Sequence, residues 1–150
     1  MANWKTTMMA SAGAGGGASY WIADTIRRPY GISTDSDFNV YVGGGNPLGQ
    51  GSHDAWMVKY DGDGNEQWAK ALGGVEVDEN NAVVVDSSGD PYGLGVLTDG
   101  SSSKRSAIKY DGSSGSITFK KIYRGGSGTR WGEAGAIDSN DNIYVASDNS

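Results

Sequence analysis

The segment VKYDGDGNEQW, from Val58 to Trp68, has two interpretations. Asp61, Asp63 and Asn65 alternate with glycine, as the oxygen ligands of a calcium-binding loop do. The same residues, placed between two alternating apolar runs, are also typical of a tight β-turn, because Gly, Asp and Asn tolerate a positive φ and bond their own backbone. The segment therefore either binds a metal or reverses the chain.

A second copy of the segment favours the turn. IKYDGSSGSITF, from Ile108 to Phe119, keeps Lys-Tyr-Asp-Gly but loses two of the three oxygen ligands. The first copy also has Glu66 where a calcium loop requires Gly, and Leu72 where it requires a bidentate Glu. We therefore expect a hairpin turn without a metal here, and likewise at the acidic stretch Asp138–Asn142.

Two sequence markers recur with one period. The Lys-Tyr-Asp-Gly blocks lie 50 residues apart, and the Gly-Gly pairs that follow them lie 52 apart. An aspartate followed by a turn and a short apolar run recurs at Asp35, Asp86 and Asp138, at intervals of 51 and 52 residues. Agreement between two independent markers predicts an internal repeat.

Each period contains four short runs of alternating apolar and polar residues, separated by turn-forming residues. Four such strands predict an antiparallel meander, and a period of about 50 residues is typical of a propeller blade. The expected fold is all-β, with antiparallel four-stranded β-meander units of about 51 residues, about two and a half of them, and an extended N-terminal arm. The predicted division is an arm at 1–28, repeat 1 at 29–78, repeat 2 at 79–129 and a partial repeat 3 at 130–150.

The residues that recur between the copies are expected to form the turns and the packing positions of the repeat. They are Lys59, Tyr60, Asp61, Gly62 and Trp68 in the first copy, and Lys109, Tyr110, Asp111, Gly112 and Phe119 in the second. The aromatic members of this set are predicted to pack between neighbouring units. Pro91, which replaces the Val or Ile of the other copies, is predicted to weaken its strand.

The combined pattern has a known counterpart. An aspartate, a turn, Asn-Val-Tyr-Val, a loop, aromatic-x-Val-Lys-Tyr-Asp and a final Gly-Gly together resemble the β-propeller repeats called SBBP repeats. These repeats recur in bacterial surface proteins and in phage appendage proteins. The resemblance covers residues 29 to 146 and implies a propeller-type array, and it implies no enzyme.

The N-terminal residues carry a second resemblance. MANWKTTMMASAGAGGG followed by YWI resembles the leader of structural proteins in tailed phages, marine podoviruses especially. A Gly/Ala/Ser segment there separates two apolar clusters, which could dock on a partner or fold back on the first unit. The predicted partner-docking residues are Trp4, Met8, Met9, Tyr20, Trp21 and Ile22.

Composition excludes several classes of function. The absence of cysteine excludes disulfides, Cys-ligated zinc and thiol catalysis. A net charge of -6 without a long basic run argues against nucleic-acid binding. No run approaches the 18 or so apolar residues of a membrane helix, so no membrane insertion is expected. Residues 13–18 fit a dinucleotide-loop pattern but follow no predicted strand, and no cofactor is expected.

No catalytic constellation emerges from the sequence. His53 is the only histidine, and its neighbours Ser52 and Asp54 cannot form a relay with it without a supporting site. Several glutamates lack repeat equivalents and could in principle serve as glycosidase acids, but nothing selects a pair. They are Glu66, Glu76, Glu79 and Glu133. The chain is therefore predicted not to be an enzyme.

Two functional hypotheses remain. The first is a non-enzymatic virion structural protein, a tail fibre or its tail-attachment region, docked to other virion tail proteins through the N-terminal arm and involved in host attachment. Closed propellers use about 4–8 blades, so the chain is expected either to be the N-terminal part of a longer polypeptide or to form a homo-oligomer, with a trimer of two-blade chains as one arrangement. A short sandwich of sheets that only borrows the repeat is the third explanation. The alternative is an extracellular or cell-surface propeller that binds a host-surface glycan or mediates adhesion, with Trp131 as one aromatic outside the repeat.

Overall fold

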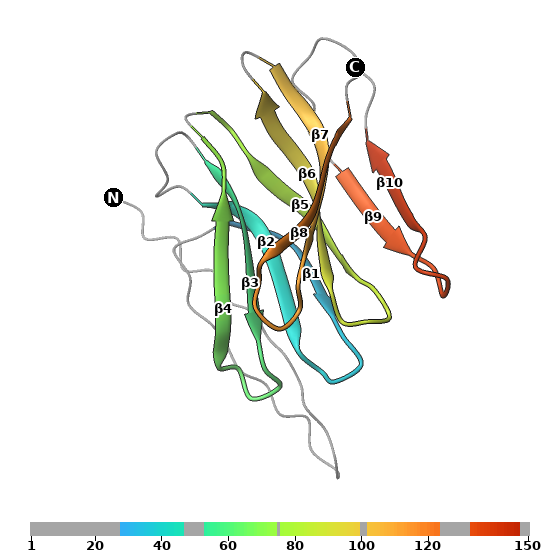
Figure 1. Cartoon of the computed structure of the whole chain (residues 1–150). Helices are drawn as coiled ribbons and strands as arrows, with labels where there is room; N and C mark the ends of the chain where they lie inside the picture. The colour runs from blue at the N-terminus through green and yellow to red at the C-terminus, as the bar shows by residue number, and fades with distance from the viewer. Residues whose placement is uncertain (1–27, 47–52, 75, 100–101, 124–132, 148–150) are drawn as a thin grey trace.

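The structure is a computed structural model that describes residues 28–46, 53–74, 76–99, 102–123 and 133–147. These residues form ten strands in three antiparallel sheets (Figure 1). The described residues include no helix long and apolar enough to cross a membrane. Residues 1–27 of the predicted N-terminal arm, with its six docking residues, lie outside the described residues, as does Trp131, whereas Arg28 is the first residue of a strand.

The sheets follow the period of the sequence. The first contains β1 (Arg28–Thr34), β2 (Val40–Asn46), β3 (Asp54–Tyr60) and β4 (Glu66–Leu72), in that order. The second contains β5 (Glu79–Val85), β6 (Pro91–Asp99), β7 (Ser102–Tyr110) and β8 (Ile117–Tyr123), again in chain order. β9 (Glu133–Ile137) and β10 (Ile143–Ser147) form a two-stranded hairpin. The predicted all-β class with four-stranded antiparallel meanders is confirmed.

The recurring aspartates stabilise the turns. Oδ1 of Asp35 accepts the backbone N–H groups of the residues two and four positions later, at 2.9 Å each. Asp86 does the same at 3.0 Å, and Asp138 at 2.9 Å. Asp61 accepts the same two N–H groups at 3.0 and 2.9 Å, so the opening segment is a hairpin turn between β3 and β4. A carboxylate that replaces missing backbone partners explains why the turn keeps this residue.

The turns after β1, β5 and β9 also share one backbone feature. The residue three positions after the aspartate is left-handed in each, with φ of 63° at Phe38, 80° at Gly89 and 61° at Asp141. Glycine adopts this conformation without steric cost, whereas a bulky side chain rarely does. The turn geometry is therefore retained even where the glycine is not.

Irregularities of the strands recur as well. The register shifts between Pro29 and Gly31 in β1 and between Asn80 and Ala82 in β5, at matching positions of the two sheets. A second shift occurs at the ends of β3 and β7, between a lysine and the tyrosine that follows it. Such bulges add twist to a strand and change the direction of its side chains. The two sheets therefore repeat their irregularities as well as their strand order.

Pro91 does not weaken its strand as predicted. It is the first residue of β6, a position where the missing N–H is tolerated. β6 contains nine residues and β2, its counterpart in the first sheet, contains seven. The proline therefore starts the strand and does not interrupt it.

The sheets pack face to face in series. β5 lies against β1 and β2 on one side and against β9 on the other (Figure 1). The first joint combines Tyr41, Met57 and Trp68 of the first sheet with Ile108 and Tyr110 of the second. The second joint is smaller and packs aliphatic side chains of the second sheet against Ile137 and Ile143. Burial of these side chains supplies the main stabilisation of the array.

Trp68 is the central side chain of the first joint. Its ring centroid lies 6.1 Å from that of Tyr41 and 6.3 Å from that of Tyr110, and only 8% of the residue is exposed. Its Nε1 donates to the carbonyl oxygen of Gly112 at 3.1 Å. The same oxygen accepts a hydrogen bond from Nζ of Lys59 at 2.8 Å. One turn of the second sheet is thus fixed to the first sheet by stacking and by two hydrogen bonds.

Tyr60 and Phe119 do not occupy a joint between described sheets. Tyr60 packs with Val58 and Trp56 on the face of the first sheet that points away from the second. Phe119 of β8 is 47% exposed, and the described part of the third unit contains two strands. Tyr110 and Trp68 meet at the first joint, and Tyr60 and Phe119 are their repeat equivalents outside it.

We predict that Gly112→Ala destabilises the protein by about 1–3 kcal/mol, as overpacking does. A Cβ there would overlap the carbonyl oxygen of Gly89 and approach the Tyr41 hydroxyl at 3.3 Å. Gly74→Ala is the control, since a Cβ at Gly74 meets nothing within 4 Å. Urea denaturation followed by far-UV circular dichroism measures both variants. Equal effects would contradict the close approach at Gly112.

We also predict that Trp68→Ala costs about 3–5 kcal/mol and Trp68→Phe a smaller amount, which includes about 1 kcal/mol for the lost hydrogen bond to Gly112. Phe119→Ala changes the equivalent position of the next repeat. Because Phe119 is about half exposed, its loss should cost less than about 1 kcal/mol. The ratio of the two alanine effects, from denaturation midpoints, tests whether the first joint carries the stability.

Candidate functional site

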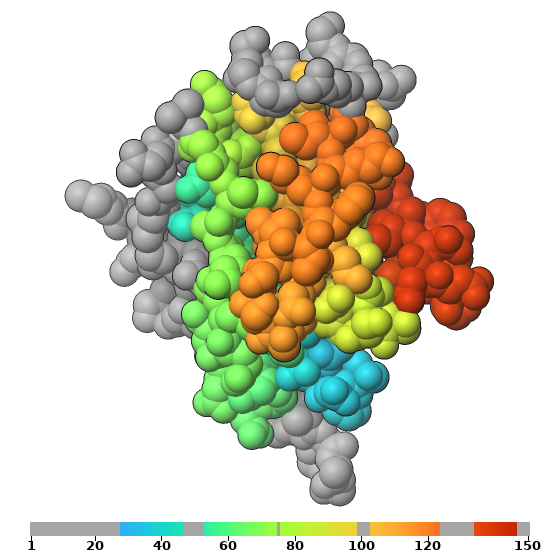
Figure 2. Space-filling model, viewed as in Figure 1, coloured from blue at the N-terminus to red at the C-terminus, as the bar shows by residue number. Residues whose placement is uncertain are grey.

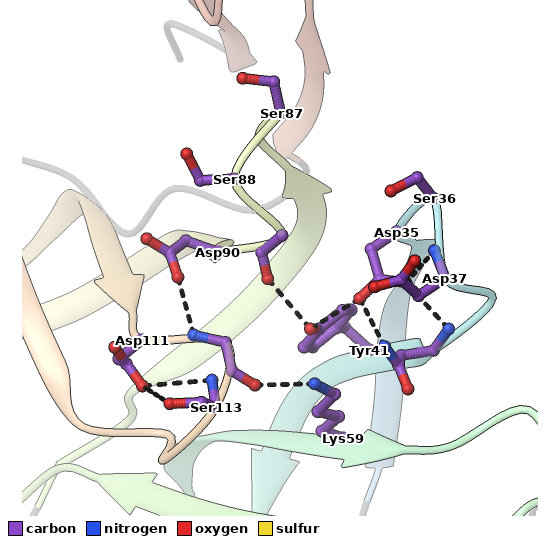
Figure 3. Close-up of a pocket in the computed structure, with 13 residues that line it drawn as sticks. Asp35, Ser36, Asp37, Tyr41, Lys59, Ser87, Ser88, Asp90, Asp111 and Ser113 are labelled. Carbon is purple, nitrogen blue, oxygen red and sulfur yellow. Dashed lines mark hydrogen bonds between the residues drawn. The ribbon is translucent and has the colours of Figure 1, made fainter.

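A polar cleft of about 470 Å³ lies at one end of the first two sheets (Figure 3). Three turns line it, with residues 35–37 and 39, 87–90 and 111–113 as their main contributions. Tyr41 and Lys59 project into the cleft from β2 and β3. The cleft forms because the first two sheets pack face to face, which brings the turns at one end of each sheet together.

Tyr41 links the first two turns. Its hydroxyl lies 3.0 Å from Oδ2 of Asp35 and 3.0 Å from the carbonyl oxygen of Gly89, so its single proton is shared between the two acceptors. Burial, and then the hydrogen bond to Asp35, raise the pKa of the Tyr41 hydroxyl. Partial burial opposes ionisation of Asp35, but hydrogen bonds from Asn39 and Tyr41 outweigh it and lower the pKa of that carboxyl group. Tyr41 is therefore a neutral donor facing a charged acceptor.

Lys109 and Asp90 fix the second sheet's own turns. Nζ of Lys109 lies 2.9 Å from Oδ2 of Asp86 and 3.0 Å from Oδ2 of Asp90. The hydrogen bond to Asp86, more than any other contact, raises the pKa of Lys109. Oδ1 of Asp90 also accepts the N–H of Gly112 at 2.8 Å. Asp90 thus connects the β5–β6 turn to the β7–β8 turn that carries Gly112.

The third unit joins this row of turns through Asp141. Its two carboxylate oxygens accept the backbone N–H of Ser87 at 2.8 Å and the hydroxyl of Ser87 at 2.6 Å. These two hydrogen bonds lower the pKa of Asp141. Asp141 occupies the left-handed position held by Gly89 in the second unit, so its side chain is directed by an uncommon backbone conformation.

The chemistry of the cleft is that of hydroxyl and carboxylate groups. Its described lining contains no histidine or cysteine, and four serines supply hydroxyls: Ser36, Ser87, Ser88 and Ser113. No group of three or more His, Cys, Asp or Glu side chains among the described residues is arranged to hold a metal ion. Hydrogen bonds from Ser113 and Ser114 lower the pKa of Asp111 to about 2 and engage it within its own turn. The arrangement can hydrogen-bond a polar ligand, and the closest hydroxyl–carboxylate contact between its lining residues, Ser113 Oγ to Asp111 Oδ1 at 2.6 Å, lies within one turn.

His53 lies at the other end of the strands, beside the second unit. Its Nδ1 is 3.2 Å from Oε1 of Glu79, which makes an ion pair when the imidazole is protonated, although the hydrogen-bond direction is poor. The hydroxyl of Tyr30 donates to the same oxygen at 3.3 Å. The contact of His53 seen here is thus with Glu79 and not with its sequence neighbours Ser52 or Asp54. In the sequence, the one signal that pointed to Glu79 was that it has no equivalent in the other repeat. The contact joins the two units at a second point.

Asp78 is the most constrained carboxyl group at this end. It is 3% exposed, and it accepts the N–H of Thr98 at 2.6 Å and the N–H of Gly74 at 2.9 Å. Burial, and to a lesser extent the charge of Asp54, raise the pKa of Asp78. Oδ1 of Asp54 is itself buried without a hydrogen-bond partner in the described structure. Two partly desolvated carboxylates therefore lie close together, and both approach the α-carbon side of Gly73.

The structure places the residues of the sequence pattern in three different settings. Lys59, Trp68, Tyr110 and Gly112 meet at the first joint, and Asp61 and Asp111 hold hairpin turns. Gly62 lies in the Asp61 turn and Lys109 binds two aspartates of its own unit. The sequence pattern missed the Tyr41–Asp35–Gly89 link and the His53–Glu79 contact.

No protein-family model matches the sequence, and no curated protein matches it. The fold and the cleft define an all-β array of meander units joined through their turns and aromatic side chains. The resemblance of its repeat to SBBP repeats and of its leader to phage structural proteins stays a prediction.

We predict that Asp54→Asn stabilises the protein at pH 7 by about 0.5–1 kcal/mol, the size of a partly screened charge repulsion. The folded-state pKa of Asp78 lies above its unfolded value, so its contribution to stability is greatest below the unfolded pKa and is lost as pH rises through the folded pKa. The gain should therefore shrink toward about pH 4, where unpaired aspartates begin to bind protons.

Asp63→Asn removes the same charge from an exposed turn and serves as the control. Urea denaturation of both variants at the two pH values separates local repulsion from a change in net charge. Stabilisation that is equal in the two variants, or that does not depend on pH, would contradict the Asp54–Asp78 interaction.

Proposed function

We propose that this chain is a non-enzymatic structural protein of a virion, a tail fibre or its tail-attachment region. The observation that carries the proposal is the distribution of exposed apolar side chains. They include Ile32 of β1 and Phe38 of the turn after it in the first sheet, Phe119 and Tyr123 of β8, and Tyr144 of β10. Large exposed apolar groups mark protein–protein contacts, so the array is suited to be one part of a larger assembly.

The internal contacts support the same proposal. Trp68 and Lys59, two side chains of the recurring pattern, join the first unit to the second through Gly112. The cleft offers hydroxyls and carboxylates that are largely engaged by their own turns. A repeated, tightly joined array acts as a rigid spacer, since each unit stabilises its neighbour.

The proposed docking element is the N-terminal arm, residues 1–28. Its two apolar clusters, centred on Trp4 and Trp21, would bind other virion tail proteins, in line with the resemblance of the leader to phage structural proteins. Copies of the chain would associate as a homo-oligomer, a trimer being one arrangement. The protein would act at the phage tail, in or near the structure that attaches to the host.

A specific observation favours the second candidate, a carbohydrate-binding or adhesion propeller at a cell surface. Phe38 is 70% exposed and belongs to the turn whose neighbours, Asp35 to Asn39, line the polar cleft. An exposed aromatic ring beside hydroxyl and carboxylate groups is the combination that stacks on and hydrogen-bonds a sugar. A left-handed φ of 63° at a phenylalanine is a conformation that functional sites retain.

Deletion of residues 1–25 tests the proposal, because β1 begins only at Arg28 and the described sheets stay complete. We expect incorporation into reconstituted particles, measured by co-sedimentation and immunoblotting, to fall by at least about tenfold. A double variant, Trp4→Ala with Trp21→Ala, should reproduce the loss if the two clusters are the anchors.

Phe38→Ala is the matched control for this experiment. Under the structural proposal it should be incorporated like the parent chain, and under the glycan hypothesis it should lose binding on a glycan array while the deletion of residues 1–25 keeps it. Normal incorporation of the truncated chain would contradict docking through the arm.

A further inference from the structure

One face of the second sheet is covered by the first sheet at the first joint, and the opposite face is covered only in part by the third unit. β4 and β8 are equivalent strands, and Trp68, Lys70 and Leu72 of β4 correspond at a spacing of 51 residues to the alternate residues of β8. Those counterparts are Phe119, Lys121 and Tyr123. Each set projects from the face that is directed at the following unit.

The three residues of β4 show what such a face normally contacts. Trp68 stacks on Tyr110 of β7 and is 8% exposed. Lys70 extends over the turn between β7 and β8, and Leu72 packs against the core of the first joint. For Trp68 and Lys70 the contacts from the following sheet come from its outer hairpin, β7–β8.

The residues of β8 lack this cover. Phe119 is 47% exposed and Tyr123 is 45% exposed, and Lys121 is exposed as well. The third unit supplies β9 and β10, which cover the inner part of the face through Ile137 and Ile143. Figure 2 shows β8 at the surface with the β9–β10 hairpin beside it. The uncovered part corresponds to the position of an outer hairpin.

The strand pairing points to the same position. β6 pairs with β5 on one edge and β7 on the other, whereas β10, its counterpart, pairs only with β9 among the described strands. A hollow of about 280 Å³ lies between this free edge and the second sheet, lined by Arg105, Ser106, Tyr123, Ile143 and Val145. An unpaired strand edge beside an apolar surface is a template for an added strand.

We infer that the free edge of β10 and the outward face of β8 form a docking surface for an antiparallel β-hairpin of this same repeat type. The first strand of the hairpin pairs with β10, and its aliphatic and tyrosine side chains, equivalent to Ile108 and Tyr110, cover Phe119 and Tyr123. The Phe119 side chain has no N–H group to donate, so this joint depends on apolar stacking and lacks an equivalent of the hydrogen bond from the Trp68 indole to Gly112. The inference rests on the proposed assembly role, since it names the partner of one end of the array.

The repeat itself supplies the probe. Ser150 corresponds to Thr98 at a spacing of 52 residues, so a second copy of residues 99–123 appended directly after Ser150 continues the register of the second sheet. Hydrogen–deuterium exchange of the full extended chain should show the amides of 143–147 exchanging at least about tenfold more slowly than in the chain alone. The control extension carries Ile108→Ser and Tyr110→Ser within the appended copy, and it should give no protection.

Phe119→Ala provides the second measurement. Its effect on the denaturation midpoint should be small in the chain alone and several-fold larger in the extended chain, approaching that of Trp68→Ala. A peptide of residues 99–123 added to the unextended chain should protect β10 in the same way, and this arm does not require the extended chain to fold.

Three results would overturn the inference. The first is equal amide exchange of β10 with the two extensions. The second is an effect of Phe119→Ala on the denaturation midpoint that the extension leaves unchanged. The third is protection of β10 in the chain alone together with a mass that rises with concentration, which would make a second copy the occupant. None of these measurements uses virions or residues 1–25. Failure of the docking surface is therefore distinguishable from failure of the proposed function.

Discussion

The array depends on the contact between Trp68 and the turn that carries Gly112. One carbonyl oxygen accepts hydrogen bonds from Trp68 and from Lys59, while the indole ring lies between Tyr41 and Tyr110. A single four-stranded sheet has two faces and cannot bury both of them by itself. The Trp68 contact fixes where the second sheet sits on the first, and the cleft between their turns, the position of Tyr41 and the pairing of His53 with Glu79 all follow from that placement.

The turn aspartates are the second constraint, and they act within each unit. Asp35, Asp61, Asp86, Asp111 and Asp138 each accept backbone N–H groups of their own turn. This use explains why the acidic residues recur with the period while the residues around them vary. In the sequence these acidic residues have the spacing of calcium ligands. In the structure their carboxylates accept backbone N–H groups of the turn, and the two uses produce the same alternating pattern of residues.

The sequence was sufficient for the meander and its period, because strand alternation and turn chemistry are local properties. It was not sufficient for the direction of individual side chains. The register shift before Tyr60 and Tyr110 changes which opposite residue each one meets, and no residue type announces that shift. The contact of His53 with Glu79 depends on how two sheets are placed, which is set by the whole joint and not by either segment. Phe119 repeats the position of Trp68 without its surroundings, since a repeat in sequence does not guarantee a following neighbour in space.

The opposite orientations of the tyrosine and the tryptophan positions give the array a polarity. Tyr60 belongs to a buried cluster on one face of the first sheet, whereas Phe119 of β8 is 47% exposed, so the two ends of the array differ. The first joint is heterologous, since the tryptophan position of one sheet meets the tyrosine position of the next, and contacts of this kind join units head to tail. Whether such contacts close depends on the rotation between successive sheets, so units added through these faces generate a ring when the rotation completes a circle and an open line when it does not. A two-fold symmetric pair would have to use some other surface of the protein.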